Sequence, residues 1–413
     1  MRAMEALSTV LCVLLLLPAF LLSGTVVTAV MLAAYVLVRP LSLTLFEKLV
    51  WHLVPAAAAV LVLLPEYWAG VEHKLYGEAA EWVKLGTENS ILLCNHRCDI
   101  DWLSGWVVGS RTGVLGGFKA IMKRSAIYVP VLGALWWLSG YIFIARDWMR
   151  DKKRMLRMFA NLRADPVPYL LVLFAEGTRF TTNKLALARE FAASKGLPLP
   201  KHTLVPKTRG FVATAKSLEG SYDSVYDITF MPAQGPRAPS LAGLFARRPA
   251  EVHVLLRRIP AADIPKDEDA LKEWCMERFR GKDAALAAHA ERGEFDAPRY
   301  HGTRRAKSVL VMGVFWVCCY LYLVATRLVP AVLTLLEQGK SRAVARGLAL
   351  GAVLTALLVR FYVTSSSAKT TDVNVSRSRV DSAEEAYEQA NGSGSKQARD
   401  GADEAAPSRV KAE

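Results

Sequence analysis

His96 and Asp101 stand five residues apart, directly after the apolar run 91–94. A carboxylate that holds an imidazole in one tautomer leaves the second ring nitrogen free to take a proton from a hydroxyl, so such a pair can act as a general base. Spacing alone does not select this pair, because His73 and His289 also precede a glutamate by five residues. The pair predicts catalysis only if other segments supply a substrate site around it.

The two side chains can meet only if the chain turns between them. A continuous helix advances about 100° per residue, so two positions five apart on one helix point away from each other. We therefore expect His96 in a turn between a strand and a helix, and Asp101 in the first turn of that helix, with Asp99 as its N-cap. The alternative is an Asp99 that only caps the helix, beside a solvated His96.

Further segments place polar or basic residues at the ends of predicted elements. The segment that follows the apolar run 169–174 contains Glu176, Gly177, Thr178 and Arg179. Its glycine permits a tight turn and its arginine can bind a phosphate in bidentate fashion, although an ion pair between its glutamate and arginine is the simpler interpretation of this segment alone. Arg146 ends a second apolar run, and Lys119 and Lys123 are four residues apart and can share a helix face. Together these residues predict an anionic ligand near the general base.

The middle of the chain, 66–300, alternates between short apolar runs and helical patterns. The runs that could form buried strands are 90–95, 141–145, 169–175, 203–206, 225–231 and 252–257. The helical patterns between them are 148–163, 184–195, 210–218 and 267–291. This alternation predicts an α/β domain in which helices cover both faces of a sheet and substrate loops lie at the carboxyl ends of the strands.

Both ends of the chain carry long apolar runs. Residues 6–38 contain no charged side chain over 33 positions, which corresponds to about 50 Å of helix against about 30 Å for the hydrocarbon core of a bilayer. This run is one long tilted helix or two shorter helices bent near Gly24, since a cleaved signal peptide would be much shorter. Further apolar runs are 49–64, 309–325 and 347–359. We expect membrane helices within 1–65 and 301–363, with buried core helices as the alternative for the shorter runs.

The composition favours a membrane surface as the binding partner. The chain has 413 residues, a net charge of +14 and 52% hydrophobic residues. No nucleic-acid motif is visible, and the basic clusters at 146–154 and 304–307 suit phospholipid headgroups. The six cysteines lack paired spacing and indicate free thiols in a reducing compartment. From about residue 364 large apolar side chains are almost missing, so we expect a disordered tail over 364–413.

In their order along the chain, these blocks resemble the glycerolipid acyltransferase family, most closely the plant and algal 1-acyl-sn-glycerol-3-phosphate acyltransferases. The matching blocks, within a resemblance that covers about 80–295, are 95–103, 143–146, 176–179 and 205–207. Cys98 stands where serine is common and Ala175 where proline is common, and neither position is expected to carry chemistry. The resemblance implies an α/β fold with a mixed sheet flanked by helices, together with N-terminal and C-terminal membrane helices.

The resemblance also implies a reaction. His96 would deprotonate the sn-2 hydroxyl of lysophosphatidic acid, Asp101 would hold the imidazolium, and the alkoxide would attack the thioester of acyl-CoA. The segment 176–179 and Arg146 would hold the phosphate of the acceptor, with Lys119 as a weaker contact. No cofactor or metal ion is expected. The expected location is the endoplasmic reticulum membrane, with the active site toward the cytosol where acyl-CoA is made.

Three alternatives stay open. Cys98 is close enough in sequence to His96 to form an acyl-thioester intermediate. The acceptor could be another lysophospholipid or glycerol 3-phosphate, or the enzyme could hydrolyse acyl-CoA. A membrane transporter is a third possibility, but transporters place ionisable groups within their spans, and the run 6–38 has none.

Overall fold

The chain folds as two units, which are described separately. In the computed structural model the described residues are 2–145, 148–233 and 238–366. The first unit comprises Met1–Arg179 and Pro206–Ala368, and the second comprises Phe180–Val205 and the tail. Arg146, a predicted phosphate contact, and the tail from residue 367 onward, which is predicted to be disordered, lie outside the described residues.

The first unit is built on an eight-stranded sheet. Its strands are β1 (Glu72–Tyr76), β2 (Ser90–Cys94), β3 (Phe118–Lys123), β4 (Ile142–Ile144), β5 (Leu170–Phe174), β6 (Ser224–Pro232), β7 (Glu251–Pro260) and β8 (Arg299–Tyr300). Their spatial order is β4-β3-β5-β2-β6-β7-β1-β8, and β2 runs parallel to both of its neighbours, β5 and β6. Antiparallel pairing joins β6 to β7 and β1 to β8. The predicted mixed sheet is confirmed.

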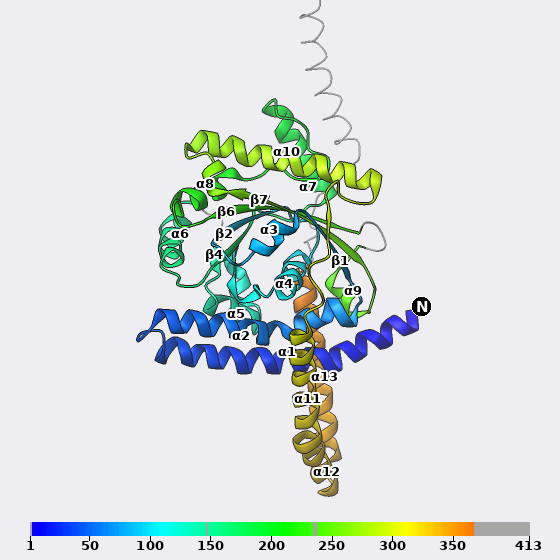
Figure 1. Cartoon of the computed structure of the whole chain (residues 1–413). Coiled ribbons are helices and arrows are strands. Elements are labelled where there is room, and N and C mark those ends of the chain that lie inside the picture. The colour runs from blue at the N-terminus through cyan, green and yellow to red at the C-terminus, as the bar shows by residue number, and fades with distance from the viewer. Residues whose placement is uncertain (1, 146–147, 234–237, 367–413) are drawn as a thin grey trace, which may run out of the picture. The chain divides into compact units, whose positions relative to one another are not determined.

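Helices cover both faces of the sheet because its central strands carry apolar side chains on both sides. In β2, Ile91 and Leu93 pack into one apolar cluster, while Leu92 and Cys94 pack into another, as expected for a parallel strand that is buried on both faces. One face is covered by α6 (Trp148–Arg163), α8 (Thr208–Ser217) and α10 (Glu268–Arg292). On the other face lie α3 (Ala79–Lys84), α4 (Asp101–Thr112), α5 (Leu132–Leu138) and α9 (Leu241–Phe245) (Figure 1).

The two N-terminal helices pack against the α4 side of the sheet. They are α1 (Arg2–Leu37) and α2 (Leu43–Leu63), and Figure 1 shows both running across that side. One apolar cluster extends from Leu103 of α4 to Val54 of α2 and Phe20 of α1. Because α1 spans Arg2–Leu37 without a break, the apolar run 6–38 forms one long helix, the first of the two predicted alternatives. Pro18 lies inside this helix.

The C-terminal helices project beyond α1 and α2 (Figure 1). They are α11 (Lys307–Leu323), α12 (Val329–Glu337) and α13 (Ser341–Ser366). The end of α13 returns to α1, where Tyr362 meets Phe20. Among the described residues, four helices are long and apolar enough to cross a membrane, namely Ala3–Leu37, Leu43–Trp68, Lys307–Glu337 and Ser341–Thr364. Protein buries 44% and 61% of the most apolar stretch of the first two, but only 11% and 6% of the last two. Apolar surface of this extent marks a contact with a membrane or with another protein, and the length of these helices favours a membrane.

The second unit contains α7 (Thr182–Ser194), close to the predicted helix 184–195. The hydroxyl of Thr181 accepts a hydrogen bond from Lys184 N at 3.3 Å and thereby caps the first turn. An N-cap hydroxyl satisfies one of the backbone donors that have no partner inside the helix.

Two predicted elements are wrong. Residues 203–206 do not form a strand, and Pro206, which has no N–H, cannot donate to a sheet ladder. Lys119 and Lys123 lie on strand β3 and not on a helix. Residues four apart lie on the same side of a strand as well as of a helix, so their spacing fits both structures. Strands β1 and β8 were not predicted.

A buried ion pair lies beneath the carboxyl end of β2. Lys282 of α10 pairs with Asp227 of β6, and both side chains are almost fully buried. The Lys282 ammonium also donates to the carbonyls of Leu93, at 3.0 Å, and Ile228, at 2.7 Å. A buried ammonium with this many acceptors ties α10 to β2, which leads into the segment of His96, and to the neighbouring strand β6.

We predict that Lys282→Met destabilises the protein by about 3–5 kcal/mol, because it leaves the Asp227 carboxylate buried without its cation. The double variant Lys282→Met/Asp227→Leu should recover most of that loss, since it removes both charges. Thermal unfolding in detergent measures both effects. A single variant as stable as the parent protein would contradict the role given to this pair.

Candidate active site

Asn95 fixes the turn that follows β2. Its side chain is fully buried, its Oδ1 accepts from Phe230 N at 2.7 Å, and its Nδ2 donates to the Phe230 carbonyl at 3.0 Å. The last residue of β2 that pairs with β6 is Cys94, which lies opposite Ile228, and Phe230 comes after Ile228 on β6. The amide therefore continues the ladder where the backbone of β2 leaves it, and this sets the direction of the chain at His96.

His96 and Asp101 meet, as their predicted placement requires. His96 Nδ1 lies 2.8 Å from Asp101 Oδ2. A carboxylate only accepts hydrogen bonds, so Nδ1 carries a proton, and in the neutral imidazole the lone pair then belongs to Nε2. The side chain of His96 is 22% exposed and that of Asp101 is fully buried. A ligand can therefore reach the imidazole but not the carboxylate, which is the arrangement that a general base needs.

The Asp101 carboxylate also closes the turn. Its Oδ2 accepts from Arg97 N at 2.6 Å and Cys98 N at 2.9 Å, and the Cys98 thiol donates to its Oδ1. Asp101 is the first residue of α4, where the partial positive charge of the helix N-terminus stabilises an anion. One buried carboxylate thus orients both the backbone of the turn and the imidazole.

Asp99 does not cap α4, so this prediction is wrong. The residue before the helix is Ile100, and no side chain caps this end. Asp99 Oδ2 instead accepts from Leu241 N at 3.4 Å. Burial raises the pKa of the Asp99 carboxyl, and the Leu241 N–H and the Arg179 guanidinium oppose that rise. Asp101 binds other backbone donors, the N–H groups of Arg97 and Cys98, which precede the helix.

Glu176 lies beside His96 because β5 runs parallel to β2 with Cys94 opposite Phe174. Glu176 is buried, and its Oε2 accepts from His96 N at 2.9 Å. The Phe174 ring lies 4.6 Å from the imidazole, centroid to centroid. The first contact holds the backbone of His96, and the second holds its ring.

Gly177 allows the tight turn that was predicted after β5. Its φ is +67°, in the left-handed region that favours glycine. A Cβ at this position would meet the Lys207 side chain at 3.0 Å, and Lys207 N donates to the Ala175 carbonyl at 2.7 Å. Lys207 therefore lies over the turn that leads to Thr178 and Arg179.

Two basic residues of this site were missed by the sequence analysis. Lys207 belongs to the fourth matching block, which gave a signal for it. Arg97 stands between the histidine and the aspartate of the first block. Burial lowers the pKa of Arg97, and the carboxylates of Glu176 and Asp101 oppose that effect, so its guanidinium lies among the acidic groups of the site.

The structure does not bring Lys119 to this site. Its Nζ lies 3.1 Å from Asp165 Oδ2 and 3.5 Å from Glu47 Oε2, and the side chain is buried. On β3, Lys119 is opposite Leu171 near the start of β5, whereas the site lies beyond the end of that strand. The carboxylates of Asp165 and Glu47 already neutralise the charge of Lys119, at the start of β5 and away from the site.

The other two histidines that precede a glutamate lie on β1 and α10. Burial lowers the pKa of His73 to about 3. His289 Nε2 lies 2.6 Å from His253 Nδ1, and burial together with this second imidazole lowers the pKa of His289 to about 4. Among the described residues, no group of three His, Cys, Asp or Glu side chains could hold a metal ion.

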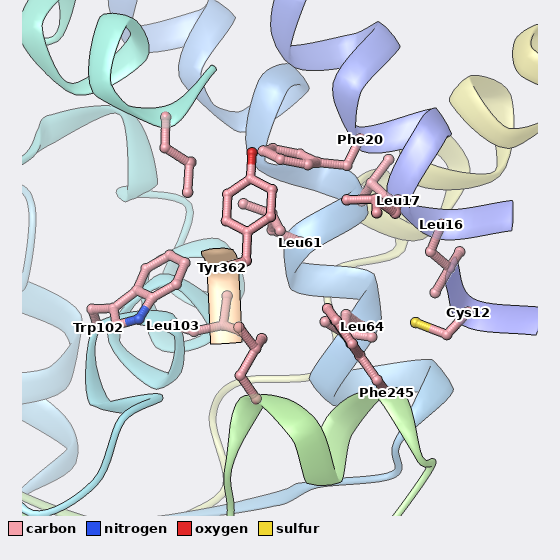
Figure 2. A pocket seen from close by; sticks show the side chains of 13 residues that line it. Cys12, Leu16, Leu17, Phe20, Leu61, Leu64, Trp102, Leu103, Phe245 and Tyr362 are labelled. Atoms are coloured by element: carbon pink, nitrogen blue, oxygen red, sulfur yellow. The ribbon is translucent and has the colours of Figure 1, made fainter. Parts of the chain in front are cut away.

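An apolar cleft begins beside the site. It is partly open, and its enclosed volume is about 50 Å³. Trp102 and Leu103, in the first turn of α4 directly after Asp101, line one side of it, and helices α1, α2 and α9 line the others (Figure 2). Tyr362 of α13 also borders the cleft. Such a lining suits a hydrocarbon chain and excludes charged groups.

Comparisons with known proteins identify the family. Residues 77–233 match the family model described as Acyltransferase, and residues 243–316 match the one described as Acyltransferase C-terminus. The chain is 36% identical over 299 residues to 1-acyl-sn-glycerol-3-phosphate acyltransferase 2 of Brassica napus, across 72% of this chain and 77% of the relative. This chain belongs to the 1-acyl-sn-glycerol-3-phosphate acyltransferase family.

Animal members of this acyltransferase family are similar to the chain to the same degree. The human 1-acyl-sn-glycerol-3-phosphate acyltransferase delta is 34% identical over 315 residues, across 76% of this chain and 82% of the relative. The solved structure of PlsC, the 1-acyl-sn-glycerophosphate acyltransferase of Thermotoga maritima, has a TM-score of 0.40 and 16% identity, covering 68% of this chain and 97% of that one. The Acyltransferase model spans the candidate residues from His96 to Arg179.

We predict that Cys98→Ser keeps about half or more of the acyltransferase activity, because the thiol is not poised as a nucleophile. Burial raises the pKa of the Cys98 thiol well above its usual range, and the Asp101 carboxylate raises it further. A serine hydroxyl can donate to the same Asp101 oxygen. Initial rates of the purified variant test this, and a loss as large as that of His96→Ala would restore the thioester alternative.

Proposed function

We propose that this protein transfers the acyl chain of acyl-CoA to the sn-2 hydroxyl of 1-acyl-sn-glycerol 3-phosphate, giving phosphatidic acid and CoA. The names of its relatives, 34–36% identical over about three quarters of the chain, support the acceptor and the reaction. The observation that carries the mechanism is the 2.8 Å contact between His96 Nδ1 and Asp101 Oδ2, which leaves Nε2 facing away from its partner.

In the proposed reaction, His96 Nε2 takes the proton of the acceptor hydroxyl as its oxygen attacks the thioester carbonyl. Asp101 stabilises the imidazolium that forms, and the turn that both residues share does not have to reorganise. Collapse of the tetrahedral intermediate breaks the carbon–sulfur bond, and the imidazolium returns its proton to the departing CoA thiolate. The imidazole is neutral at the start and at the end of each cycle.

The acceptor phosphate would bind at the turn that follows β5. Gly177 brings the backbone close to the ligand, Thr178 offers a hydroxyl, and Arg179 and Lys207 offer positive charge. Arginine binds phosphate oxygens in bidentate fashion, and lysine binds them as a point charge. Glu176 holds His96 N, so we assign it to positioning the base. Arg146 remains a candidate phosphate contact from its place in the second matching block.

The substrates would meet at a membrane surface. The part of the chain that the structure describes has four helices long and apolar enough to cross a bilayer, and the apolar cleft between α1, α2 and α4 starts at the residue after Asp101. We propose that an acyl chain enters this cleft from the bilayer while the polar groups stay at the turns around His96. Because acyl-CoA is made in the cytosol, the active site would face the cytosol, and we propose the endoplasmic reticulum membrane as the location.

We predict that His96→Ala lowers the rate of phosphatidic acid formation by about 10²–10⁴-fold, the usual contribution of a positioned general base. The measurement uses detergent-purified protein with labelled oleoyl-CoA and a panel of lysophospholipids, glycerol 3-phosphate and water as acceptors. The matched control is His301→Ala, because His301 is an exposed histidine of the same unit and its removal should leave the rate unchanged.

Formation of phosphatidic acid from lysophosphatidic acid, ahead of every other acceptor, is the expected outcome for the parent protein. Full activity of His96→Ala would refute the general-base assignment. A faster rate with a different lysophospholipid would keep the acyltransferase but change its acceptor.

A further inference from the structure

One residue of the C-terminal helix α13 is buried, in contrast to its neighbours. Tyr362 is 8% exposed, whereas Phe361 beside it is 40% exposed. The Tyr362 hydroxyl donates to the Pro130 carbonyl at 2.8 Å, just before α5. Its ring also meets that of Phe20 of α1 edge-on, with 6.3 Å between the centroids. These contacts hold the Tyr362 ring in one position between α13, α1 and the segment before α5.

The fixed ring borders the apolar cleft. Figure 2 shows Tyr362 among the lining side chains, with Phe20 and Leu61 near it and Trp102 on the side of α4. Trp102 directly follows Asp101, the partner of His96. The cleft therefore has one wall next to the candidate base and another that α13 supplies.

We propose that Tyr362 limits the length of the fatty acyl chain that this cleft accepts, so that the C-terminal membrane helix determines chain selectivity. This inference rests on the proposed acyl transfer. It concerns a part of the chain that the family models do not cover, because their matches end at residue 316. The chain in the cleft could belong to the acyl donor or to the lysophospholipid acceptor, which present the same hydrocarbon.

The physical reason is that an aromatic ring held by a hydrogen bond and by ring packing does not move aside for one more methylene. In a close-packed apolar site, one methylene too many changes selectivity about 10-fold or more. The hydroxyl bond to Pro130 fixes the ring from outside the cleft, so Tyr362 acts as a positioned wall and not as a polar contact to the substrate.

Four variants test this. Tyr362→Ala shortens the wall, Tyr362→Trp extends it, and Tyr362→Phe keeps the ring but removes the hydroxyl. Phe361→Ala is the matched control, because it removes a neighbouring ring that is exposed on the same helix. Each variant is purified as the full chain in detergent, and its melting temperature is measured so that a general loss of folding is recognised.

Two assay series distinguish the source of the chain. In one, acyl-CoA donors of increasing chain length compete for a fixed oleoyl acceptor, and in the other, lysophosphatidic acids of increasing length compete for oleoyl-CoA. We expect Tyr362→Ala to raise the rate ratio of long to medium chains by about 10-fold in one of the two series, and Tyr362→Trp to lower it. Tyr362→Phe keeps the ring but loses the bond to Pro130, so it should shift the ratio in the same direction by less than Tyr362→Ala. Phe361→Ala should keep the parent profile.

Unchanged profiles of folded Tyr362→Ala and Tyr362→Trp in both series would overturn the inference, and so would the same shift in Phe361→Ala. A parent protein that acylates no acceptor would instead refute the proposed function. In that case photocrosslinking still tests the cleft: oleoyl-CoA or lysophosphatidic acid with a diazirine at the chain terminus should label the peptide that contains Tyr362. Labelling elsewhere would contradict the position of the chain.

Discussion

The Asp101 carboxylate is the interaction on which the rest of the site depends. It is almost fully buried, and a buried carboxylate is tolerated only when its oxygens have donors. The donors come from its own turn: the backbone N–H groups of Arg97 and Cys98, the Cys98 thiol, and the imidazole of His96. Because the same charge orders the backbone and selects the tautomer of His96, the proposed base is oriented before any substrate binds.

The sheet and the membrane helices bring the remaining parts to this turn. The parallel strands β2 and β5 end at the same level, so the turn with Glu176 and Gly177 lies next to His96. Asn95 and Lys282 fix the end of β2 from β6 and α10. On the face of the sheet opposite to α10, one apolar cluster is shared by the sheet, α4, α1 and α2. A polar site at the strand ends thus lies directly beside space for hydrocarbon, as an enzyme that joins a lipid to an acyl chain requires.

The sequence alone predicted features of the site that depend on neighbouring residues. It did not predict contacts between residues that are far apart in the chain. The strand–turn–helix placement of His96 and Asp101 follows from the geometry of a five-residue spacing. The helix predicted around Lys119 was wrong because a four-residue spacing fits a strand equally well. The bond from His96 N to Glu176 and the two carboxylates around Lys119 join residues far apart in sequence. In the same way, nothing local separates Tyr362 from Phe361, and only the packed structure shows which ring is buried.

A double-mutant cycle on His96 and Asp101 tests the central claim most directly, namely that Asp101 acts through the imidazole. Initial rates of phosphatidic acid formation are measured for Asp101→Asn, His96→Ala and the double variant, each checked for folding. Each single variant should lose about 10²–10⁴-fold, and the double variant should be no slower than His96→Ala, because residues that act as one unit are strongly non-additive. Losses that multiply in the double variant would mean that Asp101 acts independently of His96 and would contradict the account.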